Sequence, residues 1–275
     1  MLVMMAPSFD GSSDAYARLA RVTGMVAYDL KSRVKAGAWG VVRALADDDE
    51  SRTLTEQLRQ EGLPVVAVPR EVAHDPNRRI VTLRSLELHA EQIVLHLRER
   101  QMTIPLGALS CIVRGEVHLG HVPARSLSPS SSTFRAVVPG SVDAAMFRES
   151  LSPSNFESFA AADLHFATVL WAARIDARSF EFPGAQSGSP ASDLDELVDT
   201  LAARAQVRVD RGVRASSVVS SLTSPSGAAR APLSISARSK ESSTDERFDP
   251  YSRLVGEAER QLAQQSAPIT DPPRT

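Results

Sequence analysis

The hydrophobic and polar positions of this chain follow two different periodicities, and the change falls near residue 78. Before that point, short apolar runs such as LVMMA (2–6) and PVVAVP (64–69) are typical of buried strands. Between them lie segments whose apolar residues recur three or four apart, which is the spacing of one helix face. The predicted order up to residue 70 is strand, helix, helix, strand, helix, strand, which indicates a small sheet covered by helices on one face.

The predicted helices of this first part carry their own start and stop signals. SSDAYARLARV (12–22) begins with a serine N-cap, either Ser12 or Ser13. MVAYDLKSRVKAG (25–37) places Val26, Leu30 and Val34 four apart on one face, and Gly37 is expected to end it. DDDESRTLTEQLRQEG (47–62) opens with acidic residues that favour the positive end of the helix dipole. WGVVRAL (39–45) supplies the strand that precedes it.

The segment ARLARVTGMVAYDLKSRVKAGAWGVVRALADDDESRTLTEQLRQEGLPVVAV resembles the C-terminal domain of the bacterial ribosomal stalk protein and the related fold of the Clp protease adaptors. The shared features are Thr23-Gly24 leading into a helix, a valine-rich strand, an acidic turn that opens a helix, and Gly62 before the closing strand. The resemblance implies a small α/β domain at 1–70. Lys31 and Lys35 are the lysines in the helix that corresponds to the factor-binding surface of the stalk family.

From about residue 78 the period of the apolar positions changes to two, which predicts half-buried strands. The predicted strands are RRIVTLRSLEL (78–88), QIVLHLRER (92–100), LSCIVRGEVHL (109–119), TFRAVVP (133–139), LHFATVL (164–170) and WAARIDARSFEF (171–182). HAEQ (89–92) and RQMT (100–103) are expected to be turns. SDLDELVDTLAARAQV (192–207) predicts a closing amphipathic helix with Ser192 as its cap.

A run of antiparallel strands sealed by one C-terminal helix resembles the pleckstrin-homology-like (PH-like) barrel. The resemblance rests on the strands from Val81 to Val117, the late pair ending in IDARSFEF, and the helix from Asp193 to Ala205. It implies a PH-like domain at 78–212, a fold that hosts many unrelated binding roles. The expected fold class is therefore α+β: a small α/β sandwich domain, a PH-like antiparallel barrel with a C-terminal helix, and a disordered tail.

The predicted tail, 213–275, loses all periodicity apart from one short helix near 249–265. RASSVVSSLTSPSGAARAPLSISARSKESSTDER is rich in serine and short of aromatic residues, so it is expected to be disordered. In FDPYSRLVGEAERQLAQQ, four apolar residues recur near helical spacing: Tyr251, Leu254, Val255 and Leu262. Such a helix either binds a partner or docks on its own chain, and the sequence leaves both open.

The composition favours a cytoplasmic protein without a membrane span. The 31 basic and 33 acidic residues give a net charge of −2, so no global field recruits nucleic acid, which is not expected as a partner. The single cysteine, Cys111, has no disulfide partner in the chain, as in a reducing cytosol. No stretch approaches the roughly 20 apolar residues of a membrane span, and MLVMM (1–5) is too short for a signal-peptide core.

The stretch SCIVRGEVHLGH (110–121) holds the residues most typical of metal or nucleophilic chemistry. Cys111 and His118 are seven apart, so a regular strand sends them to opposite faces, and Cys111 is interpreted as a small buried hydrophobe. Strand parity groups Leu109, Cys111, Val113 and Val117 on the apolar face. His118 and His121 are two ligands, whereas a zinc site needs three or four. No catalytic residue, metal site or cofactor is predicted.

The preferred hypothesis is a non-enzymatic cytoplasmic binding or adaptor protein that recognises a protein or peptide partner. The candidate contacts are Arg174, Arg178, Tyr251, Leu254, Val255 and Leu262. Alternation of Arg174 and Arg178 with Asp176 on one strand face fits cross-strand charge pairing or a patch for an acidic peptide.

Two alternatives remain open. RNA or ribosome association would act through the domain at 1–70, with Trp39 and Arg43 as the main candidate contacts. A metal-dependent hydrolase would use His118, His121 and His165. The identity of the partner and the oligomeric state are not fixed by the sequence.

Overall fold

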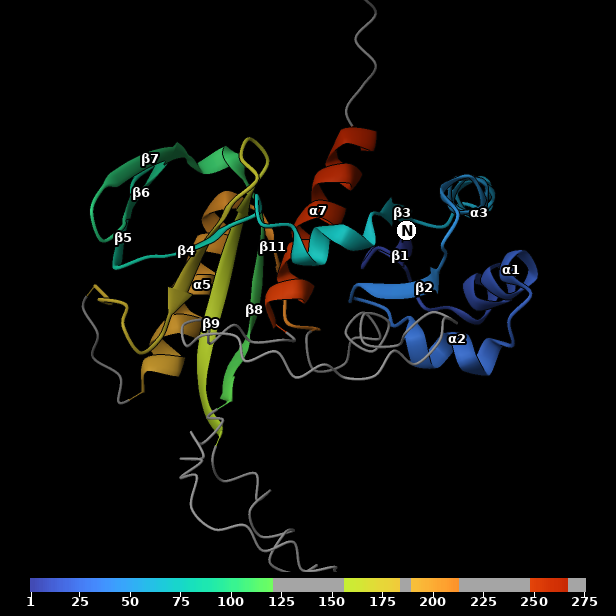
Figure 1. Cartoon of the computed structure of the whole chain (residues 1–275), viewed down its shortest axis with the longest axis horizontal. Helices are drawn as coiled ribbons and strands as arrows, with labels where there is room; N and C mark the ends of the chain where they lie inside the picture. Colours follow the sequence, from blue (N-terminus) through green and yellow to red (C-terminus); the bar gives the residue numbers. More distant parts are fainter. Residues whose placement is uncertain (121–155, 184–188, 213–247, 267–275) are drawn as a thin grey trace, which may run out of the picture.

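The computed structural model describes residues 1–120, 156–183, 189–212 and 248–266. It is an α+β protein in which one C-terminal helix, α7 (Phe248–Ser266), stands between two groups of strands (Figure 1). A three-stranded sheet with three helices lies on one side of α7, and a five-stranded sheet with a smaller three-stranded sheet lies on the other. Within these residues, no helix is both long enough and apolar enough to cross a membrane.

The N-terminal sheet has the antiparallel order β2-β1-β3. Its strands are β1 (Leu2–Met5), β2 (Gly40–Ala44) and β3 (Val65–Val68), and its helices are α1 (Ser13–Thr23), α2 (Ala27–Arg33) and α3 (Asp48–Gln60). Every element that the sequence predicts between residues 1 and 70 is present in the predicted order. Val3 and Met5 face the core under α1, α2 and α3, while Leu2 and Met4 face α7.

Local hydrogen bonds explain where these helices begin and end. Ser12 is the N-cap of α1, because its Oγ accepts the N–H of Ala15 at 3.1 Å. The prediction that the second helix ends at Gly37 is wrong. The chain leaves the helix at Val34, which is extended and fully buried and whose carbonyl accepts the hydroxyl of Tyr16 at 2.6 Å. Gly37, with φ +79°, forms the later turn toward β2.

The five-stranded sheet has the order β11-β8-β9-β10-β4. Its strands are β4 (Ile80–Thr82), β8 (Leu109–Gly120), β9 (Phe156–Phe166), β10 (Ala172–Asp176) and β11 (Arg208–Asp210). The long pair β8 and β9 is antiparallel, whereas β4 and β11 join the edges in parallel. One face is covered by α5 (Pro190–Ala205) and the other by α7.

A smaller antiparallel sheet has the order β5-β6-β7, with β5 (Ser85–Leu88), β6 (Gln92–His96) and β7 (Gln101–Pro105). Two short 3-10 helices, η1 (Arg70–His74) and η2 (Leu106–Ala108), connect β3 to β4 and β7 to β8. The larger sheet contains two parallel pairs, β4 with β10 and β8 with β11, whereas the PH-like resemblance implies an antiparallel barrel. The resemblance remains a prediction.

Several predictions for this second part need correction. The predicted strand 164–170 is wrong over its second half, because β9 ends at Phe166, and the predicted strands 92–100 and 171–182 are longer than β6 and β10. The stretch 78–88 is not one strand, because the chain passes from one sheet to another after Thr82 and continues as β5. RQMT is not a turn, since β7 begins at Gln101 and pairs with β6. The N-cap of α5 is Ser189 with Pro190 in the first turn, not Ser192. The predicted strand 133–139 and the predicted disordered stretch 214–247 lie outside the described residues.

The strand parity expected for β8 holds in part. Cys111, Val113 and Val117 share the core beneath α7. Leu109 belongs to the core on the α5 side, because the pairing register shifts between Leu109 and Cys111. The opposite face is not wet either, since Ile112 is fully buried against the core beneath α5. A sheet covered by helices on both faces has no simple dry and wet side.

Candidate functional site: the C-terminal helix and the surfaces beside it

One face of α7, which we name the apolar stripe, consists of Tyr251, Leu254, Val255, Ala258 and Leu262. The first four are fully buried and Leu262 is partly buried, in a core shared with both sheets. The sequence predicted Tyr251, Leu254, Val255 and Leu262 as partner contacts. In the structure they attach α7 to its own chain, because the core around them contains Leu2 and Val113 from the same molecule. The helix therefore docks in cis.

A second face of α7, which we name the polar strip, consists of Asp249, Ser252, Gly256 and Arg260 and lies against β9 and β10. Arg174 of β10 makes two bonds to Asp163 of β9, at 2.7 and 2.8 Å, and an ion pair with Asp249 at 2.8 Å. Its guanidinium also lies 4.8 Å from the ring centroid of Phe248. The predicted partner contact Arg174 is thus almost fully engaged inside the molecule, at 11 % side-chain exposure.

Ser252 links two residues of β9 to the helix. Its hydroxyl donates to Asp163 Oδ2 at 2.6 Å, and His165 Nε2 lies 2.8 Å from the same hydroxyl oxygen. Because a hydroxyl carries one proton, which is directed at Asp163, His165 must donate to Ser252 through Nε2–H. In a nucleophilic triad the histidine accepts the proton of the serine. The order here is reversed, so this arrangement holds the helix and does not activate Ser252.

Burial sets the protonation states of the residues where the polar strip of α7 meets β9 and β10. Desolvation lowers the pKa of His165 to about 4, although the nearby carboxylate of Asp163 acts in the opposite direction. The imidazole is therefore neutral near pH 7, as its donor role requires. Burial also raises the pKa of Asp249 against the opposing effect of Arg174. For Arg174, burial disfavours the charge, but the carboxylates of Asp163 and Asp249 outweigh it and raise the pKa.

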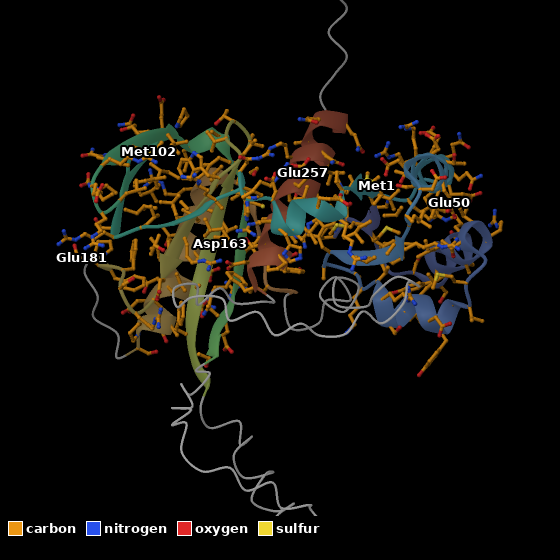
Figure 2. All side chains as sticks on the ribbon, in the orientation of Figure 1. Met1, Glu50, Met102, Asp163, Glu181 and Glu257 are labelled. Carbon is orange, nitrogen blue, oxygen red and sulfur yellow. The ribbon has the colours of Figure 1, made fainter. Side chains whose placement is uncertain are left out.

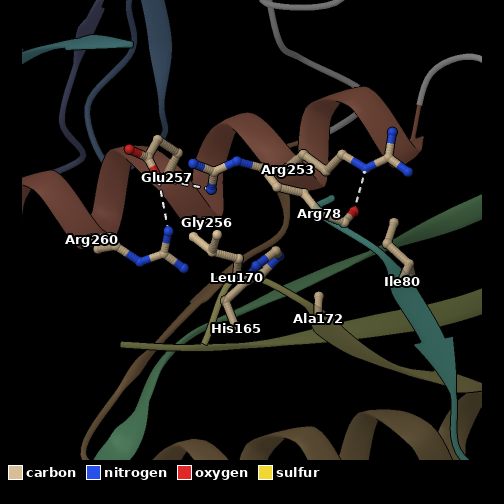
Figure 3. A pocket seen from close by; sticks show the side chains of 9 residues that line it. All are labelled: Arg78, Ile80, His165, Leu170, Ala172, Arg253, Gly256, Glu257 and Arg260. Atoms are coloured by element: carbon tan, nitrogen blue, oxygen red, sulfur yellow. Dashed lines mark hydrogen bonds and ion pairs between the residues drawn. The ribbon is translucent and has the colours of Figure 1, made fainter. Parts of the chain in front are cut away.

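Gly256 allows α7 to lie close to β9. A Cβ atom at this position would lie 2.2 Å from Nδ1 of His165. The pocket beside this contact has a volume of about 10 Å³, which is room for roughly one water molecule. Figure 3 shows its upper wall, where Glu257 pairs with Arg78 at 2.8 Å and with Arg260 at 2.9 Å. The region where the polar strip meets β9 therefore has no space for a substrate at this point.

Further polar contacts fasten the first turn and the middle of the helix. Tyr251 donates to Asp210 at 2.8 Å, and Trp39 Nε1 donates to Glu259 at 3.0 Å. Burial raises the pKa of Glu259, while the bond from Trp39 acts against this. Figure 2 shows how densely side chains fill the region between Asp163 and Glu257.

The other predicted residues are placed as follows. Arg178 is 40 % exposed, bonds Asp176 at 2.8 Å, and lies 3.4 Å from the ring centroid of Phe159. Cys111 is buried, and desolvation raises the pKa of its thiol well above the ordinary value. Within the described residues, no group of three or more histidine, cysteine or acidic side chains is placed to hold a metal ion. His121 and the side chain of His118 lie outside the described residues.

Two surface features were not found from the sequence. Val26 and Tyr28 are exposed at the start of α2, by 68 % and 84 %. Helical spacing had grouped Val26 with the buried Leu30 and Val34, but Val26 is the N-cap of α2 and points away from that core. The second feature is a groove of about 220 Å³ beside α3, β3 and α7, built by residues from three distant segments.

The chain matches no known family model, and comparison with curated proteins and with solved structures finds no significant match. The resemblances to the stalk-protein domain and to the PH-like barrel therefore remain predictions, and function has to be argued from the geometry.

Proposed function

We propose that this chain is a non-enzymatic adaptor that recognises a protein partner through the surface formed by Val26 and Tyr28. The observation that carries the proposal is the exposure of these two large apolar side chains, two residues apart, at 68 % and 84 %. Large contiguous apolar patches on folded proteins mark interaction sites, and we propose that Val26 and Tyr28 belong to such a patch. Tyrosine is enriched among the residues that dominate the free energy of binding.

The charges beside this surface indicate the kind of partner. Lys31 is exposed on the same helix, one turn after Tyr28, and Lys35 is exposed just beyond the end of α2, while Asp29, directly after Tyr28, is an exposed acid. Nζ of Lys31 lies 5.5 Å from the ring centroid of Tyr16, which holds that cation close to the α1–α2 pair. A partner with an apolar centre and an acidic rim complements this arrangement.

α7 connects the part of the molecule that carries the α2 surface to the five-stranded sheet, because its buried residues share one core with both groups of strands. A cytoplasmic location belongs to the same proposal, since one buried cysteine is in keeping with a reducing compartment.

RNA association through residues 1–70 gains no support from Trp39. This side chain is 2 % exposed and bonds Glu259, so it offers no face to a base. Of the two candidate contacts, Arg43 alone is exposed.

Site-specific photo-crosslinking in the native cell tests the proposal. A photoreactive phenylalanine analogue replaces Tyr28 in one strain and Leu170 in another, because Leu170 is also a large exposed apolar residue, at 53 %, but lies away from α2. We expect a protein crosslinked at position 28 and not at position 170. With that protein purified, Tyr28→Ala should weaken binding by about thirty-fold, the equivalent of a hot-spot residue at about 2 kcal/mol.

The matched control is Leu170→Ala, which should leave the affinity unchanged. Equal crosslinking at both positions, or unaltered affinity in Tyr28→Ala, would rule out this surface as the recognition site. Crosslinks between two copies of the chain would identify the partner as a second copy.

A further inference from the structure

The groove beside α3 is separate from the Val26 and Tyr28 surface, and α2 contributes no residue to it. It is lined by Ser51 and Arg59 from α3, Ala67 from β3 and Gln261 from α7, with Met1 at its margin. Figure 2 labels Met1 in this part of the molecule, between α7 and the helix of Glu50. Its volume of about 220 Å³ far exceeds the about 10–15 Å³ that one buried water needs.

Ala67 lines this groove, and its backbone N–H and C=O groups point away from β1. Successive strand residues direct their N–H and C=O groups to opposite edges. The carbonyl of Pro64 points toward β1, because it accepts the N–H of Ala6 at 2.7 Å. The carbonyl of Val65 points the other way, where Arg59 Nε donates to it at 3.1 Å. Ala67 has the same orientation as Val65, and β3 ends the sheet, so both backbone groups of Ala67 are directed outward.

The edge of β3 is open over a short length only. Arg59 occupies the carbonyl of Val65, and Pro69, the next residue with outward groups, has no N–H and accepts from Val72 at 3.2 Å. Such features prevent the addition of a long strand. A ligand of this edge must therefore pair through the single residue Ala67.

A second observation points to a ligand at this place. Ser51 lines the groove and is fully buried, and its hydroxyl oxygen has no hydrogen-bond partner among the described residues. Buried polar groups are nearly always paired, so an unpaired hydroxyl indicates a position completed by a ligand or by water. Thr55, the neighbouring buried hydroxyl, already donates to the carbonyl of Ser51 at 2.7 Å.

The charges of the groove define what the ligand carries. The bond from Arg59 Nε to Val65 fixes the guanidinium at one end, and Arg59 has no ion-pair partner within the described part of the chain. A fixed guanidinium binds a carboxylate through two parallel hydrogen bonds. Asp48 and Glu56 line the same groove, and their carboxylates repel a negatively charged ligand from the parts of the groove beside them. Arg52 also lines the groove, but it is exposed and paired with Asp49 at 2.9 Å. The position beside Arg59 therefore favours a ligand that carries a carboxylate.

We infer that this groove binds the C-terminal end of an extended peptide. In antiparallel pairing, the peptide residue opposite Ala67 exchanges both backbone hydrogen bonds with it. The peptide then runs toward Val65, and two residues span about 6.8 Å. Its terminal carboxylate therefore arrives beside Arg59. This site and its peptide do not depend on the Val26 and Tyr28 surface.

A paired peptide array tests the inference on the full chain. Each hexapeptide, with its last three positions varied, is synthesised once with a free C-terminal carboxylate and once as the carboxamide. We expect the carboxylate forms to bind about ten-fold more tightly, as for a charge-assisted hydrogen-bond pair. Equal binding of both forms, or no binding of either, would overturn the inference.

Variants of the protein show which site binds the peptides of the array. Ala67→Pro removes the outward N–H but no bond to β1, so it should fold with nearly unchanged Tm and lose the peptide. Arg59→Gln should lose the preference for the carboxylate, and Glu56→Gln, which removes a repelling charge, should tighten binding. Tyr28→Ala should bind the array normally, which separates this site from the adaptor surface. Unchanged array binding in both Ala67→Pro and Arg59→Gln would exclude the groove.

Discussion

The apolar stripe and the polar strip of α7 hold the same helix by different physics. The apolar stripe buries Tyr251, Leu254, Val255 and Ala258 completely against both sheets. Burying a large apolar side chain contributes about 1.5–3 kcal/mol. The polar strip contributes little net free energy, because desolvation of buried charges offsets their attraction.

This comparison indicates that the apolar stripe supplies most of the free energy that holds α7, whereas the polar strip fixes the position of α7 along the sheets. A shift of α7 by one turn, about 5.4 Å, would still leave apolar residues against the sheets. The same shift would remove Asp249 from Arg174 and Ser252 from Asp163, and would bring a residue with a Cβ atom against His165. The polar strip therefore selects one position of the helix among several that the apolar stripe would accept.

The largest expected effect is that of Arg174→Ala, which breaks the polar strip and leaves Asp163 and Asp249 buried without their cation. Removal of one partner from a buried ion pair typically lowers the free energy of unfolding by about 3–5 kcal/mol. Urea denaturation followed by circular dichroism measures this loss.

Arg178→Ala is the matched control, since Arg178 pairs with Asp176 on the same strand side but is 40 % exposed. Its loss should be smaller, about 1–2 kcal/mol, because Arg178 is 40 % exposed although Asp176 is only 11 % exposed. Similar losses in the two variants would contradict a larger contribution of the buried Arg174 ion pairs than of the Arg178 ion pair.

Acid is expected to lower the free energy of unfolding by a smaller amount. Unfolded His165 binds a proton below about pH 6.5, whereas the folded chain binds it only below about pH 4. Because the unfolded state binds more protons in this window, stability is complete above pH 6.5 and falls as the pH drops toward 4, by at most about 3 kcal/mol. The raised pKa of Asp249 acts in the opposite direction and reduces the slope.

Denaturant unfolding at a series of pH values measures this slope, and His165→Gln provides the comparison. The variant should lose stability less steeply between pH 6.5 and 4. Parallel curves for the two proteins would mean that His165 is not the titrating group.

The smallest expected effect is that of Gly256→Ala, which sharpens the comparison at one contact. The added methyl group meets His165 and should lower the free energy of unfolding by about 1–3 kcal/mol, in spite of the better helix propensity of alanine. In the double variant Gly256→Ala, His165→Ala the clash is absent, so a double-mutant cycle should give a favourable coupling of at least about 0.5 kcal/mol. Additive losses would contradict this contact.

The sequence could predict elements whose signals are local, and it failed where partners are distant. The strands and helices of residues 1–70 each carry their own periodicity and caps, and all are present. In β9, the alternation of Ala161, Asp163 and His165 is typical of a wet face, yet this face is buried. The hydroxyl of Ser252 on α7, which pairs with His165 and Asp163, is 87 and 89 residues away from them, so no sequence pattern near β9 indicates this contact.

The candidate surfaces were missed for related reasons. Val26 has the spacing of a core residue, and only the position of the first helical turn shows that it lies outside the core. The groove joins Ser51, Ala67 and Gln261, which no local pattern connects. The predicted contacts Tyr251, Leu254 and Val255 were recognised as an apolar helix face, but the sequence does not say which surface covers it.

The position of α7 has a consequence for the order in which the protein is made. Leu2 and Met4 of the first strand are covered by a helix that begins at Phe248, roughly 250 residues later. Translation at about 5–20 residues per second leaves that face uncovered for roughly 12 to 50 seconds on every nascent chain. A chain whose synthesis stops before α7 therefore keeps Leu2 and Met4 uncovered, and chaperones and proteases can recognise it by this apolar face.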